Sequence, residues 1–261
     1  LTAKTNGTVV PRTESELIPE VDGRVIEISP ALVSGGFFSS GELLLRIDPL
    51  DYEVALDQAR AGLTRAESDL DNAERTLKRQ RDLVSRGATS DSQRDDALNR
   101  VRIAQATLRD ASSRLSRATR DLKRTRIVAP YDGRVRSERV DVGQFVKRGT
   151  SVGTIYAVDF AEVRLPIQDE EIAFLDLPLT QGRNENSKGA APVLLRARFA
   201  GAEHPWEGRV VRTEGELDPS TRMVNVVAQV PKPYAPDGER QPLSVGLFVD
   251  AEIMGSTVPN L

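Results

Sequence analysis

The sequence lacks cysteine entirely and contains a single histidine, His204, among its 261 residues. Without cysteine there is no disulfide, no thiol nucleophile and no thiolate metal site. One imidazole also argues against histidine-rich metal centres and histidine-based catalytic triads. Two pairs of acidic residues are adjacent in the sequence, Asp95–Asp96 and Glu170–Glu171. Adjacent side chains point in different directions on a helix, so neither pair is suited to act together in catalysis. We therefore expect no catalytic residues, no bound metal and no cofactor, so that the protein is not an enzyme.

Long apolar runs are missing as well. No stretch of about 18 apolar residues occurs, so no segment is expected to span a bilayer. The chain opens with Leu1-Thr2-Ala3-Lys4, which is not a signal peptide and has no starting Met. We expect any targeting or anchoring segment to lie upstream. The net charge of −3 gives no overall signal for nucleic-acid binding.

The middle of the chain has neither proline nor aromatic residues. No proline lies between Pro49 and Pro130, and no aromatic residue lies between Tyr52 and Tyr131. Apolar residues recur there at alternating spacings of four and three, which is a heptad pattern typical of coiled coils. They are Tyr52, Leu56, Ala59, Leu63, Ala66, Leu70, Ala73 and Leu77, followed by Ala97, Val101, Ala104, Leu108, Ala111, Leu115, Ala118 and Leu122. The spacing predicts two helices that fold back on each other within residues 49–126.

The segment between these two heptad runs has the residues of a helical turn. Gly87 suits the left-handed conformation that ends a helix, and Ser90 with Gln93 resembles a capping box that begins the next. Each helix would cover roughly 35 residues and extend about 50 Å. Residues 53–126 hold 17 basic and 12 acidic side chains. Because no aromatic residue accompanies them, we interpret these charges as a solvated helix face with some interhelical ion pairs, and not as a nucleic-acid site.

Two copies of one pattern flank the predicted hairpin. Asp22-Gly23-Arg24-Val25 recurs as Asp132-Gly133-Arg134-Val135. Gly35-x5-Gly41-x5-Ile47 recurs as Gly143-x5-Gly149-x5-Ile155. The residues between the glycines are typical of short strands, and each copy alone is too small to bury a core. We expect residues 17–48 and 127–157 to form one β domain, with the hairpin inserted between its halves.

Beyond Asp159 the sequence alternates between apolar and polar residues, as in half-buried strands. Such strands are typical of an antiparallel sheet or barrel. We expect residues 158–254, together with residues 9–16, to form this barrel. The predicted fold class is therefore α+β: an antiparallel coiled-coil hairpin inserted in a split β domain, followed by an antiparallel β-barrel.

This order of parts resembles the periplasmic adaptors, or membrane fusion proteins, of tripartite efflux pumps and type I secretion systems. The two half-motifs resemble lipoyl and biotinyl carrier domains, whose modified lysine lies at the junction of the halves. The same junction here reads Arg46-Ile47-Asp48-Pro49-Leu50 and has no lysine. The segment Leu217–Val224 resembles the Asp-Pro-x-Thr-Arg-Thr signature of the adaptor barrel, and Val245–Val249 resembles the strand that follows it. The resemblance also implies that residues 1–8 and 255–261 are the remnant of a membrane-proximal domain.

The predicted turn carries a further similarity to adaptors that dock onto TolC-like outer-membrane channels. Such adaptors have Arg-x3-Leu-x6-Ser at the hairpin end, and this chain has Arg79-x3-Leu83-x6-Ser90. The resemblance implies that Arg79, Leu83 and Ser90 contact the channel. Leu83 lies off the heptad seam, which predicts an exposed leucine. Ser90 has a second explanation as a helix N-cap, and the two roles are compatible.

The resemblance implies partners and a location for the protein. The hairpin length is similar to that of adaptors of resistance-nodulation-division (RND) pumps. The partners would be an inner-membrane, proton-driven efflux transporter, a TolC-like channel and further copies in a ring, as a hexamer or a trimer of dimers. The protein would lie in the periplasm, anchored to the inner membrane through an upstream segment. Alternatives are an adaptor of an ABC-type exporter or type I secretion system, a lipoyl or biotinyl carrier component, and a coiled-coil scaffold.

Overall fold

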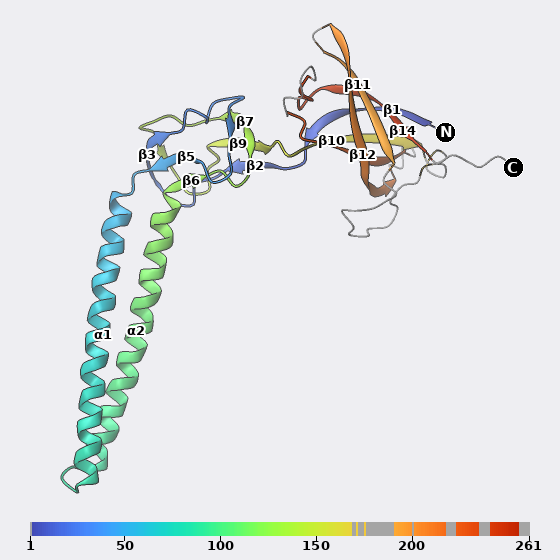
Figure 1. The fold of residues 1–261 in the computed structure, drawn as a ribbon. Helices are drawn as coiled ribbons and strands as arrows, with labels where there is room; N and C mark the ends of the chain where they lie inside the picture. The colour runs from blue at the N-terminus through green and yellow to red at the C-terminus, as the bar shows by residue number, and fades with distance from the viewer. Residues whose placement is uncertain are drawn as a thin grey trace, which may run out of the picture.

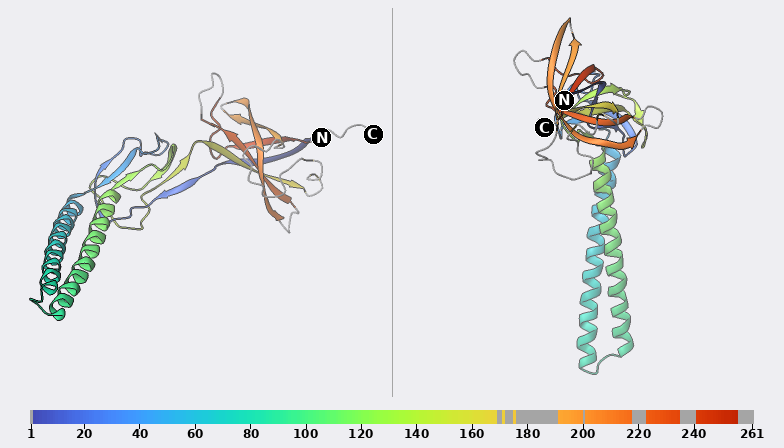
Figure 2. Two further views of the ribbon diagram at one scale, coloured as in Figure 1. Left: turned by 60° about the horizontal axis from the view of Figure 1, so that its bottom comes forward. Right: turned by 90° about the vertical axis from the view of Figure 1, so that its right-hand side faces the viewer.

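The computed structural model consists of a helical hairpin, a β-sandwich and a closed β-barrel, which follow one another along an elongated molecule (Figure 1). It describes residues 2–168, 171, 175, 191–199, 201–217, 223–234 and 241–255. The hairpin projects from one end of the sandwich, and the barrel lies at the other end (Figures 1 and 2). The tip of the hairpin is therefore the part of the molecule farthest from the barrel.

The hairpin consists of α1 (Leu50–Ser85) and α2 (Asp91–Arg124), which lie side by side and run in opposite directions. The helices follow from the long proline-free stretch of helix-forming residues. Near the tip, the side chains of Leu77, Ala97 and Val101 are buried against one another, and Leu70, Ala73 and Leu98 pack around them. These contacts set the register of the two helices.

The sandwich is built from two four-stranded sheets, in the orders β2-β9-β7-β4 and β6-β5-β3-β8. Its strands are β2 (Glu14–Leu17), β3 (Gly23–Ile28), β4 (Phe37–Phe38), β5 (Leu43–Ile47), β6 (Arg126–Val128), β7 (Gly133–Glu138), β8 (Phe145–Val146) and β9 (Gly153–Ala157). The two sequence repeats exchange strands, because β4 of the first repeat pairs with β7 of the second, and β8 pairs with β3. Each repeat thus completes the sheet of the other, which explains why neither could bury a core alone.

Both ends of the hairpin join neighbouring strands of one sheet. Strand β5 leads into α1, α2 leads into β6, and β5 and β6 pair with each other. Thr125, which ends α2, is almost fully buried, and its hydroxyl donates to the carbonyl of Leu122 at 2.7 Å. The sandwich therefore fixes the two helix ends side by side.

The barrel is closed by six antiparallel strands in the order β1-β10-β13-β12-β11-β14. They are β1 (Thr2–Pro11), β10 (Phe160–Gln168), β11 (Pro192–Phe199), β12 (Ala202–Leu217), β13 (Met223–Pro231) and β14 (Phe248–Met254). Its core contains Trp206, whose indole Nε1 donates to the carbonyl of Gln241 at 3.0 Å. The mixed α+β class and the closed barrel are thus confirmed. Residues 218–222 of the barrel signature lie outside the described residues.

The structure corrects two expected boundaries at the start of the chain. Residues 2–8 were expected outside the barrel, but they pair along their whole length with β14. Gly7 also allows β10 to approach β1 closely, because a Cβ there would lie 2.3 Å from the backbone oxygen of Arg164. Residues 14–16 were expected in the barrel, but β2 pairs with β9 in the sandwich. Of the expected membrane-proximal remnant, residue 1 and residues 256–261 lie outside the described residues.

Within the described part of the chain, no helix has the length and apolar character needed to cross a membrane.

Candidate partner-binding surfaces

Among the described residues, no group of three or more His, Cys, Asp or Glu side chains could hold a metal ion. His204 is half-buried, and its ring lies 6.1 Å from that of Trp206. Asp95 accepts from the neighbouring Arg94 at 2.9 Å. His204 and Asp95 lie in different parts of the molecule, on β12 and on α2.

The turn at the hairpin tip is tightly defined. The amide of Gly87 donates to the carbonyl of Val84 at 2.9 Å, and the amide of Ala88 donates to that of Leu83 at 2.9 Å. These bonds form a Schellman motif, which requires a left-handed residue, and Gly87 has φ of +69°. The hydroxyl of Ser90 accepts from the amide of Gln93 at 3.4 Å and caps α2. The tip is therefore closed by local hydrogen bonds at both helix ends.

The three residues predicted to contact a channel lie around this turn. The Arg79 side chain is exposed and makes no hydrogen bond or ion pair with the described residues, and Ser90 is exposed as well. Leu83 is half-buried, so the prediction of an exposed leucine was wrong. The Schellman turn brings the backbone of Gly87 and Ala88 back to the last turn of α1. The capping box is incomplete, because the Gln93 side chain contacts the Thr89 hydroxyl and not the Ser90 amide.

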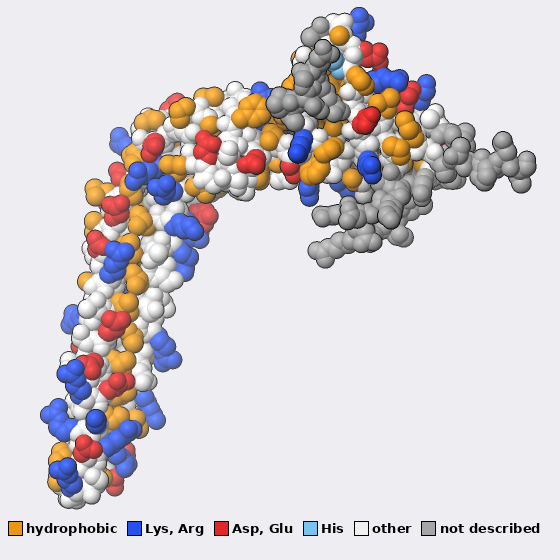
Figure 3. All heavy atoms as spheres, in the orientation of Figure 1, with side chains coloured by type: hydrophobic (Ala, Val, Ile, Leu, Met, Phe, Trp, Pro, Cys, Tyr) orange, Lys and Arg blue, Asp and Glu red, His pale blue; other side chains and the backbone are white. Residues whose placement is uncertain are grey.

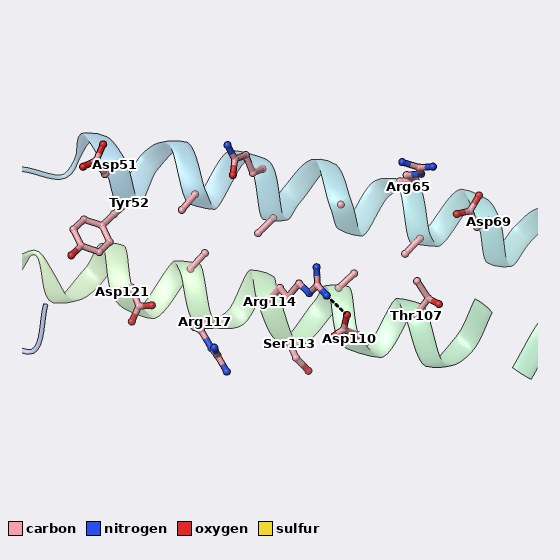
Figure 4. Close-up of a pocket in the computed structure, with 17 residues that line it drawn as sticks. Asp51, Tyr52, Arg65, Asp69, Thr107, Asp110, Ser113, Arg114, Arg117 and Asp121 are labelled. Carbon is pink, nitrogen blue, oxygen red and sulfur yellow. Dashed lines mark ion pairs between the residues drawn. The ribbon is translucent and has the colours of Figure 1, made fainter. Parts of the chain in front are cut away.

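A groove, which the sequence did not predict, separates the helices near the sandwich. Its volume is about 1060 Å³ and small residues line much of it, among them Ala59, Gly62, Ala66, Ala111 and Ala118. Figure 4 shows Tyr52 at the sandwich end of this groove, with Asp51 and Asp69 on α1 and Asp110, Arg114 and Arg117 on α2. The heptad pattern of leucine and alanine runs through both halves of the hairpin, but the cluster formed by Leu77, Ala97 and Val101 lies near the tip.

A second unpredicted feature connects the sandwich to the barrel. Arg134 of β7 donates to the carbonyl of Gly35 at 2.7 Å, and its guanidinium lies over the rings of Phe37 and Tyr234. Tyr234 follows β13 of the barrel and meets Phe37 edge-on, with 5.9 Å between the ring centroids. Burial, together with a hydrogen bond to Tyr234, raises the pKa of Tyr156 to about 12. An aromatic residue in a proline-rich loop was the only sequence signal for this contact.

The barrel wall contains an ion pair whose acidic member is nearly buried. Glu162 of β10 is 5% exposed, and its two carboxylate oxygens accept from Arg212 at 2.8 and 2.7 Å. Gln229 donates to the same carboxylate at 3.4 Å. The bidentate geometry satisfies a charge that would otherwise be costly to bury. Glu162, Gln229 and Arg212 belong to the neighbouring strands β10, β13 and β12, so this contact has a structural role in the barrel wall.

Comparison with known proteins shows what the chain as a whole is similar to. A family model described as the RND membrane fusion protein (MFP) barrel-sandwich hybrid domain matches residues 13–158. The chain is also 26% identical over 254 residues to a "Multidrug resistance protein MdtA" of Yersinia pseudotuberculosis. That match covers 97% of this chain and 55% of the relative. The chain thus spans about half the length of the curated relatives it matches.

Solved structures share the fold. The membrane fusion protein Spr0693 of Streptococcus pneumoniae superposes with a TM-score of 0.68 at 17% identity, covering 98% of this chain and 100% of the other. A MacA–MexA chimera containing the Pseudomonas aeruginosa MexA α-hairpin domain gives a TM-score of 0.63 at 18% identity, covering 100% of this chain and 83% of the other. At these identities, the similarity concerns the fold alone.

Proposed function

Because the chain belongs to the family of RND membrane fusion proteins, which are adaptors and not enzymes, we propose that it links two membrane proteins of an efflux pump. In this proposal, an inner-membrane, proton-driven RND transporter lies at the barrel end and a TolC-like outer-membrane channel lies at the hairpin tip. The protein acts in the periplasm and is anchored to the inner membrane. The exported compounds are drugs or other small molecules, consistent with the name of the multidrug resistance protein MdtA relatives.

The observation that supports this proposal most directly is the projection of the hairpin away from both β units (Figure 1). A helical tip at one end of an elongated molecule can contact a partner that the barrel cannot reach. Arg79 and Leu83 lie four residues apart on α1, so they share one face of the helix, and Ser90 lies across the turn. A partner helix that packs along this face would find an unpaired guanidinium beside an apolar side chain.

The sandwich supports a structural role and not a carrier role. Its exchanged repeats resemble a lipoyl or biotinyl domain, but the junction between β5 and α1 is Asp48-Pro49, with no lysine to modify. We propose that the sandwiches of several copies stack side by side in a ring around the exported substrate, as a hexamer or a trimer of dimers. The packed seam near the tip, in this proposal, is a coiled coil that holds the docking end in position.

Substitution of Leu83 by aspartate tests the proposal. In the full-length protein, Leu83→Asp should abolish drug resistance in cells that depend on this adaptor, because a charge would replace the apolar contact with the channel. Val54→Asp is the matched control, since Val54 is a half-exposed apolar residue of α1 near the opposite end of the hairpin. Both variants should retain normal expression and helicity. Undiminished resistance in the Leu83→Asp strain would overturn the tip assignment.

A further inference from the structure

The groove between α1 and α2 is large enough for a drug-sized organic molecule. Its volume of about 1060 Å³ is at the upper end of the range of small-molecule pockets. Four of its lining residues belong to the heptad seam and form its floor, namely Ala59, Ala66, Ala111 and Ala118. On the face shown in Figure 3, hydrophobic side chains follow the line between the two helices, and charged side chains lie on either side. The groove thus combines an apolar floor with a charged rim.

The charges on the rim are not paired across the groove. Within residues 50–124, all of which the structure describes, each ion pair joins residues of the same helix, apart from the pair between Arg124 and Glu20 of the sandwich. The interhelical pairs expected from the sequence are therefore absent from this part of the chain. Arg65 and Arg117 of the lining form no ion pair with any described residue. No salt bridge closes the groove from above.

Tyr52 lies at the sandwich end of the groove, among several carboxylates. Its ring lies between the two helices (Figure 4), and its hydroxyl donates to the carbonyl of Asp22 at 2.7 Å. This hydrogen bond holds the ring in a fixed orientation. Burial raises the pKa of Tyr52, and the negative charges of Asp22, Asp121 and Asp51 raise it further. The aromatic ring therefore lies in a negative electrostatic environment.

These carboxylates are only partly neutralised. Arg124 is shared between Asp121, at 3.1 Å, and Glu20 of the sandwich, at 2.7 Å. Asp22 and Asp51 form no ion pair with any residue that the structure describes. Four carboxylates at this end of the groove thus share one guanidinium. An aromatic ring beside unpaired carboxylates attracts organic cations.

We propose that the sandwich end of the groove binds amphiphilic organic cations, which carry a single positive charge on a flat apolar body. The charged group lies against the ring of Tyr52, close to Asp51 and Asp121, and the apolar body covers the alanine floor. An anion of the same shape is repelled by the carboxylates. This inference rests on the proposed function, because it names the class of compound that the pump would export.

Two dyes with the same ring system test the charge selectivity. Rhodamine 6G is a cation at neutral pH, fluorescein is an anion, and both are flat xanthenes. Fluorescence anisotropy with the purified full-length protein should show saturable binding of rhodamine 6G, at least about tenfold tighter than that of fluorescein. Equal affinities for the two dyes, or no saturable binding of rhodamine 6G, would overturn the proposal.

Two pairs of variants locate the binding site. Ala118→Phe fills the floor and should weaken rhodamine 6G binding about tenfold, whereas Ala106→Phe, on an exposed position of α2 outside the lining, should not change it. Asp51→Asn should weaken binding about threefold. Glu53→Gln is its control, since Glu53 is exposed on the same helix turn and does not line the groove. Equal affinities within both pairs would show that the dye binds elsewhere.

A further variant tests the sign of the electrostatic effect. Arg117→Gln removes an unpaired cation of the lining and should tighten rhodamine 6G binding about threefold, at unchanged helicity. Weaker binding by this variant would contradict the proposed attraction. These measurements use no transporter or channel, so their failure leaves the tip assignment intact, and failure of the Leu83→Asp test leaves the binding of the dye intact.

Discussion

The guanidinium of Arg134 lies 4.8 Å from the ring centroid of Phe37. Both residues belong to the sandwich, but the same guanidinium also faces the ring of Tyr234, at 5.8 Å, on a segment that follows the last residue of β13 in the barrel. The hydroxyl of Tyr234 accepts from the backbone amide of Val245 at 3.3 Å. The barrel and the sandwich are therefore joined by side-chain packing as well as by the chain itself.

Removing this packing should loosen the junction. Tyr234→Ala eliminates the ring contacts with Phe37 and Arg134 and should lower the free energy of unfolding by about 1–2 kcal/mol. Solution scattering should also record a broader range of overall lengths. Tyr234→Phe keeps the ring and loses only the hydroxyl, so its scattering should remain close to that of the parent chain. Identical scattering from all three proteins would contradict this role of Tyr234.

Two glycines of the hairpin should respond in opposite directions to the same substitution. Gly87→Ala should destabilise the hairpin by about 1 kcal/mol, because φ of +69° is unfavourable for a residue with a Cβ. Gly62→Ala should stabilise it by about 0.5–1 kcal/mol, since Gly62 lies within α1 and a Cβ there meets nothing within 4 Å. Thermal unfolding followed by helical circular dichroism measures both changes. A shift of the same sign in the two variants would be inconsistent with the described turn.

The ion pair in the barrel wall should be sensitive to loss of its cation. Arg212→Ala leaves the buried Glu162 carboxylate with only Gln229 at 3.4 Å and should cost about 2–3 kcal/mol. Arg164→Ala is the control, because the pair between Arg164 and Glu214 is largely exposed and should contribute less than about 1 kcal/mol. Urea unfolding of the two variants provides the comparison. Equal losses would indicate that the Glu162 site is more hydrated than its burial implies.

Tyrosine titration should resolve Tyr156 from the other three tyrosines. Burial and the hydrogen bond to Tyr234 raise the pKa of Tyr156 to about 12, whereas an unfolded tyrosine titrates near pH 10. The stabilisation from the neutral phenol is thus complete below about pH 10 and is lost as the pH rises towards 12. Ultraviolet difference absorbance should show a late step that disappears in Tyr156→Phe. A single transition of all four tyrosines near pH 10 would rule out this shift.

Local sequence signals predicted the helices and their turn well. The heptad runs indicated helices within residues 49–126, and the structure has them at Leu50–Ser85 and Asp91–Arg124. Gly87 and Ser90 were assigned from the chemistry of a few neighbouring residues, and both adopt the expected conformations. Helix ends and caps depend on contacts between residues that are close in the sequence, so the residue types there are enough to predict them.

Features that depend on distant partners were harder to predict. The alternation of strands β1 and β2 indicates that they are half-buried, but not which strand each one pairs with, so the boundary between barrel and sandwich was misplaced. The groove was missed because the heptad pattern alternates leucine and alanine along both halves of the hairpin and does not indicate how far apart the two helices lie. The contact of Tyr234 with Phe37 joins residues nearly two hundred positions apart, and no local pattern encodes it.

The attachment of the hairpin has an evolutionary and a practical consequence. Strand β5 leads into α1, and α2 leads into β6. Because these two strands are adjacent, both helices join the sandwich at the same place. Whole heptads can therefore be added or removed in pairs without moving any strand. The length of the hairpin can therefore be exchanged independently of the β units. A hairpin from a relative could be grafted between Asp48 and Thr125 to suit an assembly that spans a different distance.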